Sequence, residues 1–167
     1  MSRGSVLVEV TVSYVILAFA IVAIIPAFVL ALKANKNTEQ IQTATDLSQE
    51  LMEEIRMRRW DENTPFPRST YITASSTTLG PEAGETDKTL FDDIDDFNGW
   101  TESAVKDPMN NAVAAFAGFS RSVTVGYVDS SLVAVASPGT SDYKQVTVCA
   151  QNSKIRPVCL STIFTNR

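Results

Sequence analysis

Aspartates are interleaved with large apolar side chains between Leu90 and Trp100, and this stretch offers the residue types needed to bind a metal ion. Hard cations such as calcium take several oxygen ligands, which carboxylates and amides supply. The candidate calcium ligands are Asp92, Asp93, Asp95, Asp96 and Asn98. The stretch does not match an EF-hand loop, because the first and twelfth ligand positions of that loop would fall on Ile94 and Val105.

A second interpretation of the same stretch needs no ion. Its apolar residues would anchor an acidic loop on the protein core; they are Phe91, Ile94, Phe97 and Trp100. The aspartates between them would then stay in solvent, as most carboxylates do. We favour this interpretation, so the sequence predicts no cofactor, with calcium as the one candidate ion.

Catalysis is not predicted for this chain. The sequence contains no histidine, which is the commonest general base and the commonest metal ligand. It also lacks a Gly-x-Ser-x-Gly pattern around a nucleophile. The aspartates from Asp92 to Asp96 have no identifiable acid–base partner. We therefore expect no catalytic residues and a protein that is not an enzyme.

Cys149 and Cys159 are the only cysteines in the chain. Each lies in a segment with the composition of a β-strand, and Gln151 to Arg156 join the two segments. A hairpin centred near Lys154 would place the cysteines opposite each other, which predicts a cross-strand disulfide formed in an oxidising compartment. Free thiols and a metal site are the alternatives, although Cys-x9-Cys is not a zinc-binding pattern.

The elements that position these residues begin with an almost purely apolar run from Val6 to Leu32. As a helix, this run is long enough to cross a hydrocarbon core of ~30 Å. It is longer than the apolar stretch of ~7 to 15 residues in a secretory signal. An uncleaved single-pass anchor would account for its length, but not for the charge of Glu9 or the helix-disturbing Pro26.

A short basic leader, Met1 to Gly4, precedes Ser5. Glu9 is the fifth residue and Pro26 the twenty-second when counting starts at Ser5. These three features resemble the N-terminal segment of type IV prepilins and type II secretion pseudopilins. The resemblance implies cleavage by a prepilin peptidase between Gly4 and Ser5, followed by methylation of Ser5. It also implies that Glu9 pairs with the freed N-terminal amine of a neighbouring subunit, and that Pro26 kinks the helix.

The apolar run continues into an amphipathic helix. Apolar residues recur at spacings of three and four on its predicted core-facing side, which Met52 widens; they are Ile41, Ala44, Leu47, Leu51 and Ile55. One helix is therefore expected from about Ser5 to Arg59, ending before Pro65. The segments Leu51–Arg56 and Phe91–Phe97 further resemble those of minor pilins of the mannose-sensitive haemagglutinin type.

A strand is predicted from Ser120 to Val128, with Val123, Val125 and Tyr127 on one face, and the cysteine hairpin follows it. The predicted fold class is α+β and pilin-like, with one long N-terminal α-helix packed on a small antiparallel β-sheet. The expected divisions of the chain are a prepilin leader (1–4), the transmembrane half of the helix (5–32), its amphipathic half (33–60), a loop region (61–118) and an antiparallel sheet with a C-terminal hairpin (119–167).

The resemblance implies a structural subunit, either a minor pilin or a pseudopilin, in a type IV pilus or a type II secretion filament. Its partners would be other pilin-like subunits, the prepilin peptidase, an inner-membrane assembly platform and the membrane. It would cross the inner membrane once, with a periplasmic domain, before it enters a periplasmic or cell-surface filament. A net charge of −5 argues against nucleic acid as a partner. The alternative is an extracytoplasmic binding domain on an uncleaved membrane anchor.

Overall fold

The computed structural model describes residues 3–64, 78–135 and 141–166, with side chains from Leu7 onward. Met1, Ser2 and Pro65, which bear on the expected leader and helix end, lie outside the described residues. The chain divides into two compact units, Met1–Gln40 and Ile41–Arg167.

The predicted α+β class is confirmed, with one N-terminal helix and a four-stranded antiparallel sheet. The elements in chain order are helix α1 (Arg3–Arg56), 3-10 helix η1 (Asp95–Phe97), strand β1 (Thr101–Glu102), 3-10 helix η2 (Ala114–Phe116) and strands β2 (Phe119–Val128), β3 (Tyr143–Asn152) and β4 (Val158–Thr165). Three of these short elements, η1, β1 and η2, lie within the region expected to be loop.

The first unit consists of the apolar part of α1. Every side chain from Leu7 to Glu39 is exposed. In the described part of the chain, α1 is the one helix whose length and composition would let it cross a membrane. Helices of this kind occur in membrane anchors and in signal sequences. Hydroxyl groups in this part donate to carbonyl oxygens of the preceding turn, as Ser13 Oγ does to Glu9 O at 2.8 Å, which satisfies them within the helix.

Helix α1 ends at Arg56 rather than near Arg59. Its last turn tightens, because the amide of Arg58 donates to Ile55 O at 3.0 Å, a bond across three residues. The amide of Arg59 then donates to Asp92 O at 3.2 Å. The chain therefore leaves the helix to pair with a segment far along the sequence, which local helix signals do not reveal.

The second unit begins with the amphipathic part of α1, whose apolar face is buried as predicted for five of six positions. These five residues are Ala44, Leu47, Leu51, Met52 and Ile55, each at most 4% exposed. Ile41 is 43% exposed, so its prediction is wrong. It lies one turn before Ala44, where the covered part of the helix begins.

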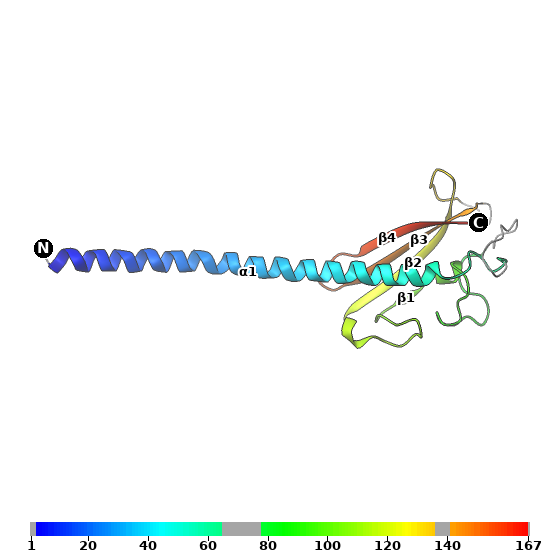
Figure 1. Cartoon of the computed structure of the whole chain (residues 1–167), viewed down its shortest axis with the longest axis horizontal. Coiled ribbons are helices and arrows are strands. Elements are labelled where there is room, and N and C mark those ends of the chain that lie inside the picture. The colour runs from blue at the N-terminus through cyan, green and yellow to red at the C-terminus, as the bar shows by residue number, and fades with distance from the viewer. Residues whose placement is uncertain (1–2, 65–77, 136–140, 167) are drawn as a thin grey trace. The chain divides into compact units, whose positions relative to one another are not determined.

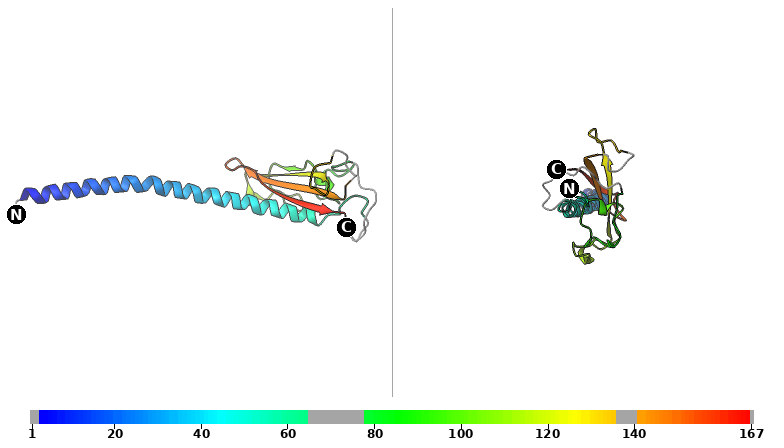
Figure 2. Two further views of the ribbon diagram at one scale, coloured as in Figure 1. Left: turned by 90° about the horizontal axis from the view of Figure 1, so that it is seen from above. Right: turned by 90° about the vertical axis from the view of Figure 1, so that its right-hand side faces the viewer.

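The sheet has the order β1-β2-β3-β4, so each strand pairs with its neighbour in sequence. Figures 1 and 2 show β2, β3 and β4 beside the last turns of α1. Side chains alternate across the sheet, and the predicted face of Val123, Val125 and Tyr127 is buried. Val146 and Val148 of β3 belong to the same core cluster, together with Leu51 and Ile55 of α1. The acidic loop between Leu90 and Trp100 packs into this same cluster.

Candidate functional site

The acidic stretch folds into a compact loop around η1, anchored by its apolar side chains. Phe91, Ile94 and Phe97 are buried in the same core cluster as Leu51 of α1. The ring of Phe91 packs edge-on against the rings of Phe97 and Trp100, with centroids 5.0 and 5.3 Å away. The predicted anchoring of this loop is therefore confirmed.

The aspartates of the loop do not all stay in solvent, so that part of the favoured interpretation is wrong. Asp93, Asp95 and Asp96 are each at most 1% exposed. A buried carboxylate is costly unless hydrogen bonds or cations compensate its charge. Backbone amides of the loop and the distant Lys144 are such partners, and they cannot be recognised from the sequence.

Two of the buried aspartates fold the loop back on itself. Asp93 Oδ1 accepts the backbone N–H groups of Asp95 and Asp96 at 2.8 and 3.3 Å. Asp96 Oδ2 accepts those of Asp92 and Asp93 at 2.9 and 3.0 Å. Burial, together with the neighbouring carboxylates of Asp95 and Asp96, raises the pKa of Asp93 to about 9. Its protonated form is therefore favoured at neutral pH.

The five candidate calcium ligands do not form one group. Asp92 pairs with Arg59, and Asn98 Oδ1 accepts the N–H of Val125 in β2 at 3.0 Å. The described carboxylates that lie close enough to share a cation form two groups, Glu62 with Asp92 and Asp93, and Glu82 with Glu85 and Asp96. Asp95 belongs to neither group.

The group of Glu82, Glu85 and Asp96 joins two loops that are separate in sequence. One ligand oxygen from each residue lies within 4.8 Å of the other two. Burial and the carboxylates of Asp96 and Glu85 raise the pKa of Glu82 to about 8. The neutral form of Glu82 is therefore favoured at neutral pH, because the neighbouring carboxylates would repel its negative charge.

Lys144 is a fully buried cation behind the acidic loop. From β3, its Nζ donates to Trp60 O at 2.6 Å and pairs with Asp95 and Asp61 at 2.5 and 3.4 Å. The ammonium also lies over the rings of Trp60 and Tyr127, 4.2 and 5.3 Å from their centroids. Lys144 therefore compensates Asp95 and ties the loop and the end of the helix to the sheet.

A second buried network surrounds Glu102 of β1. Its carboxylate pairs with Arg121 of β2 at 2.7 Å and with Lys88 at 3.2 Å. Lys88 also pairs with Glu54 of α1 at 3.1 Å, and Arg121 donates to Leu47 O at 3.3 Å. Burial alone would raise the pKa of Glu102, but Arg121 and Lys88 outweigh it and lower that pKa. The network joins helix, loop and sheet.

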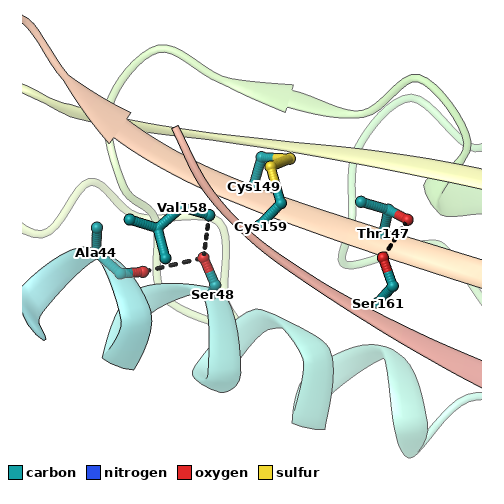
Figure 3. Close-up of a disulfide and its surroundings, with 7 residues drawn as sticks. All are labelled: Ala44, Ser48, Thr147, Cys149, Val158, Cys159 and Ser161. Carbon is teal, nitrogen blue, oxygen red and sulfur yellow. Dashed lines mark hydrogen bonds between the residues drawn. A yellow bond between two sulfur atoms is a disulfide. The ribbon is translucent and has the colours of Figure 1, made fainter. Parts of the chain in front are cut away.

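The predicted disulfide between Cys149 and Cys159 is confirmed. The two residues are directly paired between β3 and β4, with Cα atoms 4.0 Å apart. Figure 3 shows the disulfide on the side of the strands away from α1, beside the hydrogen-bonded pair of Thr147 and Ser161. On the helix side, Ser48 Oγ donates to the carbonyl oxygens of Ala44 and Val158 at 2.9 and 3.3 Å.

The predicted N-terminal residues all lie in α1. Gly4 and Ser5 belong to its first turn, and Pro26 lies in its interior. Glu9 is exposed and borders a shallow hollow that is also lined by Val10, Ser13, Tyr14 and Leu17. Leader cleavage, methylation, the assembly contact and the kink therefore stay predictions.

Several charged residues of these networks were not predicted, although two of them carry a sequence signal. Lys144 is in phase with the buried Val146 and Val148, and Arg121 is in phase with the buried Val123. A charged residue on the apolar phase of a strand points into the core and requires a counter-charge. The same reasoning does not reach Lys88, Glu82 or Glu85, because they lie in irregular segments.

A scan against models of protein families gave no match, and searches of the curated proteins and of the solved structures gave none either. The fold itself resembles that of pilins. It has a long apolar N-terminal helix, a four-stranded antiparallel sheet packed on the helix and a disulfide between the last two strands.

Proposed function

We propose that this chain is a structural subunit, a minor pilin or pseudopilin, of a type IV pilus or a type II secretion filament. The observation that carries the proposal is the division of α1 into two kinds of surface. Its side chains are exposed and mostly apolar from Leu7 to Leu32, whereas Ala44 to Ile55 present a buried stripe to a small antiparallel sheet. An exposed apolar surface of this extent requires lipid or other protein to cover it.

For a subunit of such a filament, lipid covers the apolar surface first and neighbouring subunits cover it afterwards. The apolar part of α1 is embedded in the inner membrane before assembly, and the same part packs against neighbouring subunits afterwards. The domain that contains the sheet lies in the periplasm first and then on a periplasmic or cell-surface filament. The partners are other pilin-like subunits, the prepilin peptidase and an inner-membrane assembly platform.

Glu9 supports this proposal because its charge is unusual on such a surface. It is the one residue among Asp, Glu, Lys and Arg between Leu7 and Leu32. A carboxylate within a bilayer costs at least ~2.5 kcal/mol unless it is neutralised or paired. The freed N-terminal amine of Ser5 in a neighbouring subunit would neutralise it, and Pro26 would let the helix bend as subunits pack.

We propose a structural role rather than a catalytic one. The absence of histidine from the sequence supports this choice. The buried aspartates support it as well, since Asp93 and Asp96 fold their own loop and Asp95 pairs with Lys144. These contacts stabilise the domain without presenting a group to a substrate.

The decisive test is the mass of the N-terminal peptide of the full chain, isolated from cells with and without a prepilin peptidase. We expect loss of Met1 to Gly4 and a methylated Ser5 only where the peptidase is present. Gly4→Val is the matched variant, because it changes the residue before the cleaved bond and should retain the leader. An intact leader in both strains would reject processing and favour a binding domain on an uncleaved anchor.

A further inference from the structure

The turn from Glu82 to Glu85 brings two carboxylates to the edge of the acidic loop. The turn closes through Glu85 N–H, which donates to Glu82 O at 3.1 Å. Glu82 N–H donates to Glu85 Oε2 at 3.0 Å, which fixes the second side chain against the turn. Just before the turn, Gly80 adopts a φ of 123°, and a Cβ there would lie 4.0 Å from Asn98 O. The two loops are therefore in close contact.

Asp96 contributes the third carboxylate from the opposite loop. It is 1% exposed, and its Oδ2 accepts two backbone N–H groups. Its Oδ1 is buried and has no hydrogen-bond partner in the described part of the chain. A buried carboxylate oxygen left without a partner costs more than an ordinary unmade hydrogen bond. The other oxygen is fully used, so Oδ1 is the one available to a ligand.

Among the described residues, the three carboxylates of Glu82, Glu85 and Asp96 have no lysine or arginine as an ion-pair partner. The second acidic group differs in this respect, because Asp92 is paired with Arg59. Like charges this close, one of them buried, are stable together only if a cation or protons compensate them.

We propose that Glu82, Glu85 and Asp96 bind a calcium ion that joins the turn at 82–85 to the loop of η1. The ligands are all oxygen atoms, which hard cations prefer, and they come from two irregular segments rather than a rigid octahedral cage. Calcium accepts such flexible geometry with carboxylates, backbone carbonyls and water, whereas magnesium demands near-ideal octahedral geometry. The proposal does not depend on the filament role proposed above.

The test is a calorimetric titration of the full chain in detergent with calcium chloride, after removal of bound metal by a chelator. We expect one site with a dissociation constant on the order of 10⁻⁴ to 10⁻³ M or tighter, as in weak to moderate calcium modules. Because calcium would bind only the folded protein, the melting temperature should rise with its concentration. Magnesium chloride at the same concentration should cause a smaller rise.

The matched variants separate the two acidic groups. Glu82→Gln with Glu85→Gln should weaken calcium binding at least tenfold, whereas Glu62→Gln in the other group should leave it unchanged. Both glutamates of the double variant lie outside the core, and circular dichroism would verify that it folds. The proposal is overturned if the wild-type chain gives neither heat nor a melting shift with calcium, if magnesium matches calcium, or if Glu62→Gln weakens binding equally.

Discussion

Glu102 connects three separate segments of the second unit through one buried carboxylate. Arg121 and Lys88 pair with it, and the amide of Lys106 donates to its Oε2 at 3.1 Å. Replacing all the charged partners of a buried network by apolar groups changes the free energy of unfolding little. Removing only one of them is strongly destabilising. The uncompensated partner, rather than the lost attraction, then sets the cost.

Glu102→Gln should lower the free energy of unfolding by about 3 to 5 kcal/mol at pH 7, because Arg121 is left buried without a counter-charge. Urea unfolding of the full chain in detergent measures the change. Glu53→Gln is the matched control, since Glu53 forms an exposed ion pair with Arg56 across one turn of α1. Exposed pairs contribute at most about 1 kcal/mol, so this variant should stay close to the wild type.

The effect of Glu102→Gln should also depend on pH. The folded-state pKa of Glu102 lies below its ordinary value of 4.5, so its ionised form stabilises the fold above pH 4.5. That contribution is lost as pH falls through the lower folded-state pKa. The difference between wild type and variant should therefore shrink below about pH 4.5. An unchanged difference at pH 3 would mean that the charge of Glu102 does not stabilise the domain.

At the scale of elements, hydrophobic periodicity predicted the helix and the longer strands. The other features depend on pairing between segments that lie far apart in the sequence. Leu47, Leu51 and Ile55 mark the buried face of α1 because residues three and four apart share a side of the helix. The end of α1 at Arg56 and the two-residue strand β1 depend on partners far along the chain. Short elements of this kind have too few residues to show a period.

The acidic loop shows the same limit for the candidate site. Its aromatic anchors were predictable because large apolar residues seek the core wherever they lie. The different contacts of Asp95 and Asp96 were not predictable, since Asp95 pairs with Lys144 whereas Asp96 lies beside Glu82. Neither contact follows from spacing within the loop.

The disulfide is the element-scale feature whose removal is easiest to interpret. Changing Cys149→Thr and Cys159→Ser together should lower the free energy of unfolding by about 2 to 3 kcal/mol, because the cross-link no longer restricts the unfolded chain. The replacement copies the neighbouring Thr147 and Ser161 pair, so strand pairing should persist. Denaturant unfolding measures the loss, and circular dichroism tests the fold.

The control for this variant is Thr147→Ala with Ser161→Ala, which removes one exposed cross-strand hydrogen bond. Such a bond contributes about 0.5 to 1.5 kcal/mol to the free energy of unfolding. If the cysteine variant is as stable as the wild-type chain, the disulfide does not stabilise the sheet.

At the scale of the whole molecule, assembly of the proposed filament depends on Glu9. Glu9→Ala should reduce the amount of the chain in sheared filaments at least tenfold relative to the membrane fraction. The reason is that the N-terminal amine of a neighbour would be buried without its partner, at a cost of about 3 to 5 kcal/mol. Immunoblots of the two fractions measure the ratio.

Glu50→Ala is the matched control, because it removes an exposed carboxylate from the same helix outside the apolar part. Its filament content should equal that of the wild type. Normal incorporation of Glu9→Ala would exclude the assembly contact, although leader processing could still place the chain in the superfamily.

The core of the second unit combines residues that are synthesised far apart in time. Ser48 of α1 bonds to Val158 across 110 residues, and Leu51 shares its core cluster with Phe164 of β4. At a synthesis rate of ~5 to 20 residues per second, about 5 to 20 s separate the emergence of these segments. The amphipathic face of the helix is thus not fully covered until the last strand emerges, and a chaperone that shields such a face would act before then.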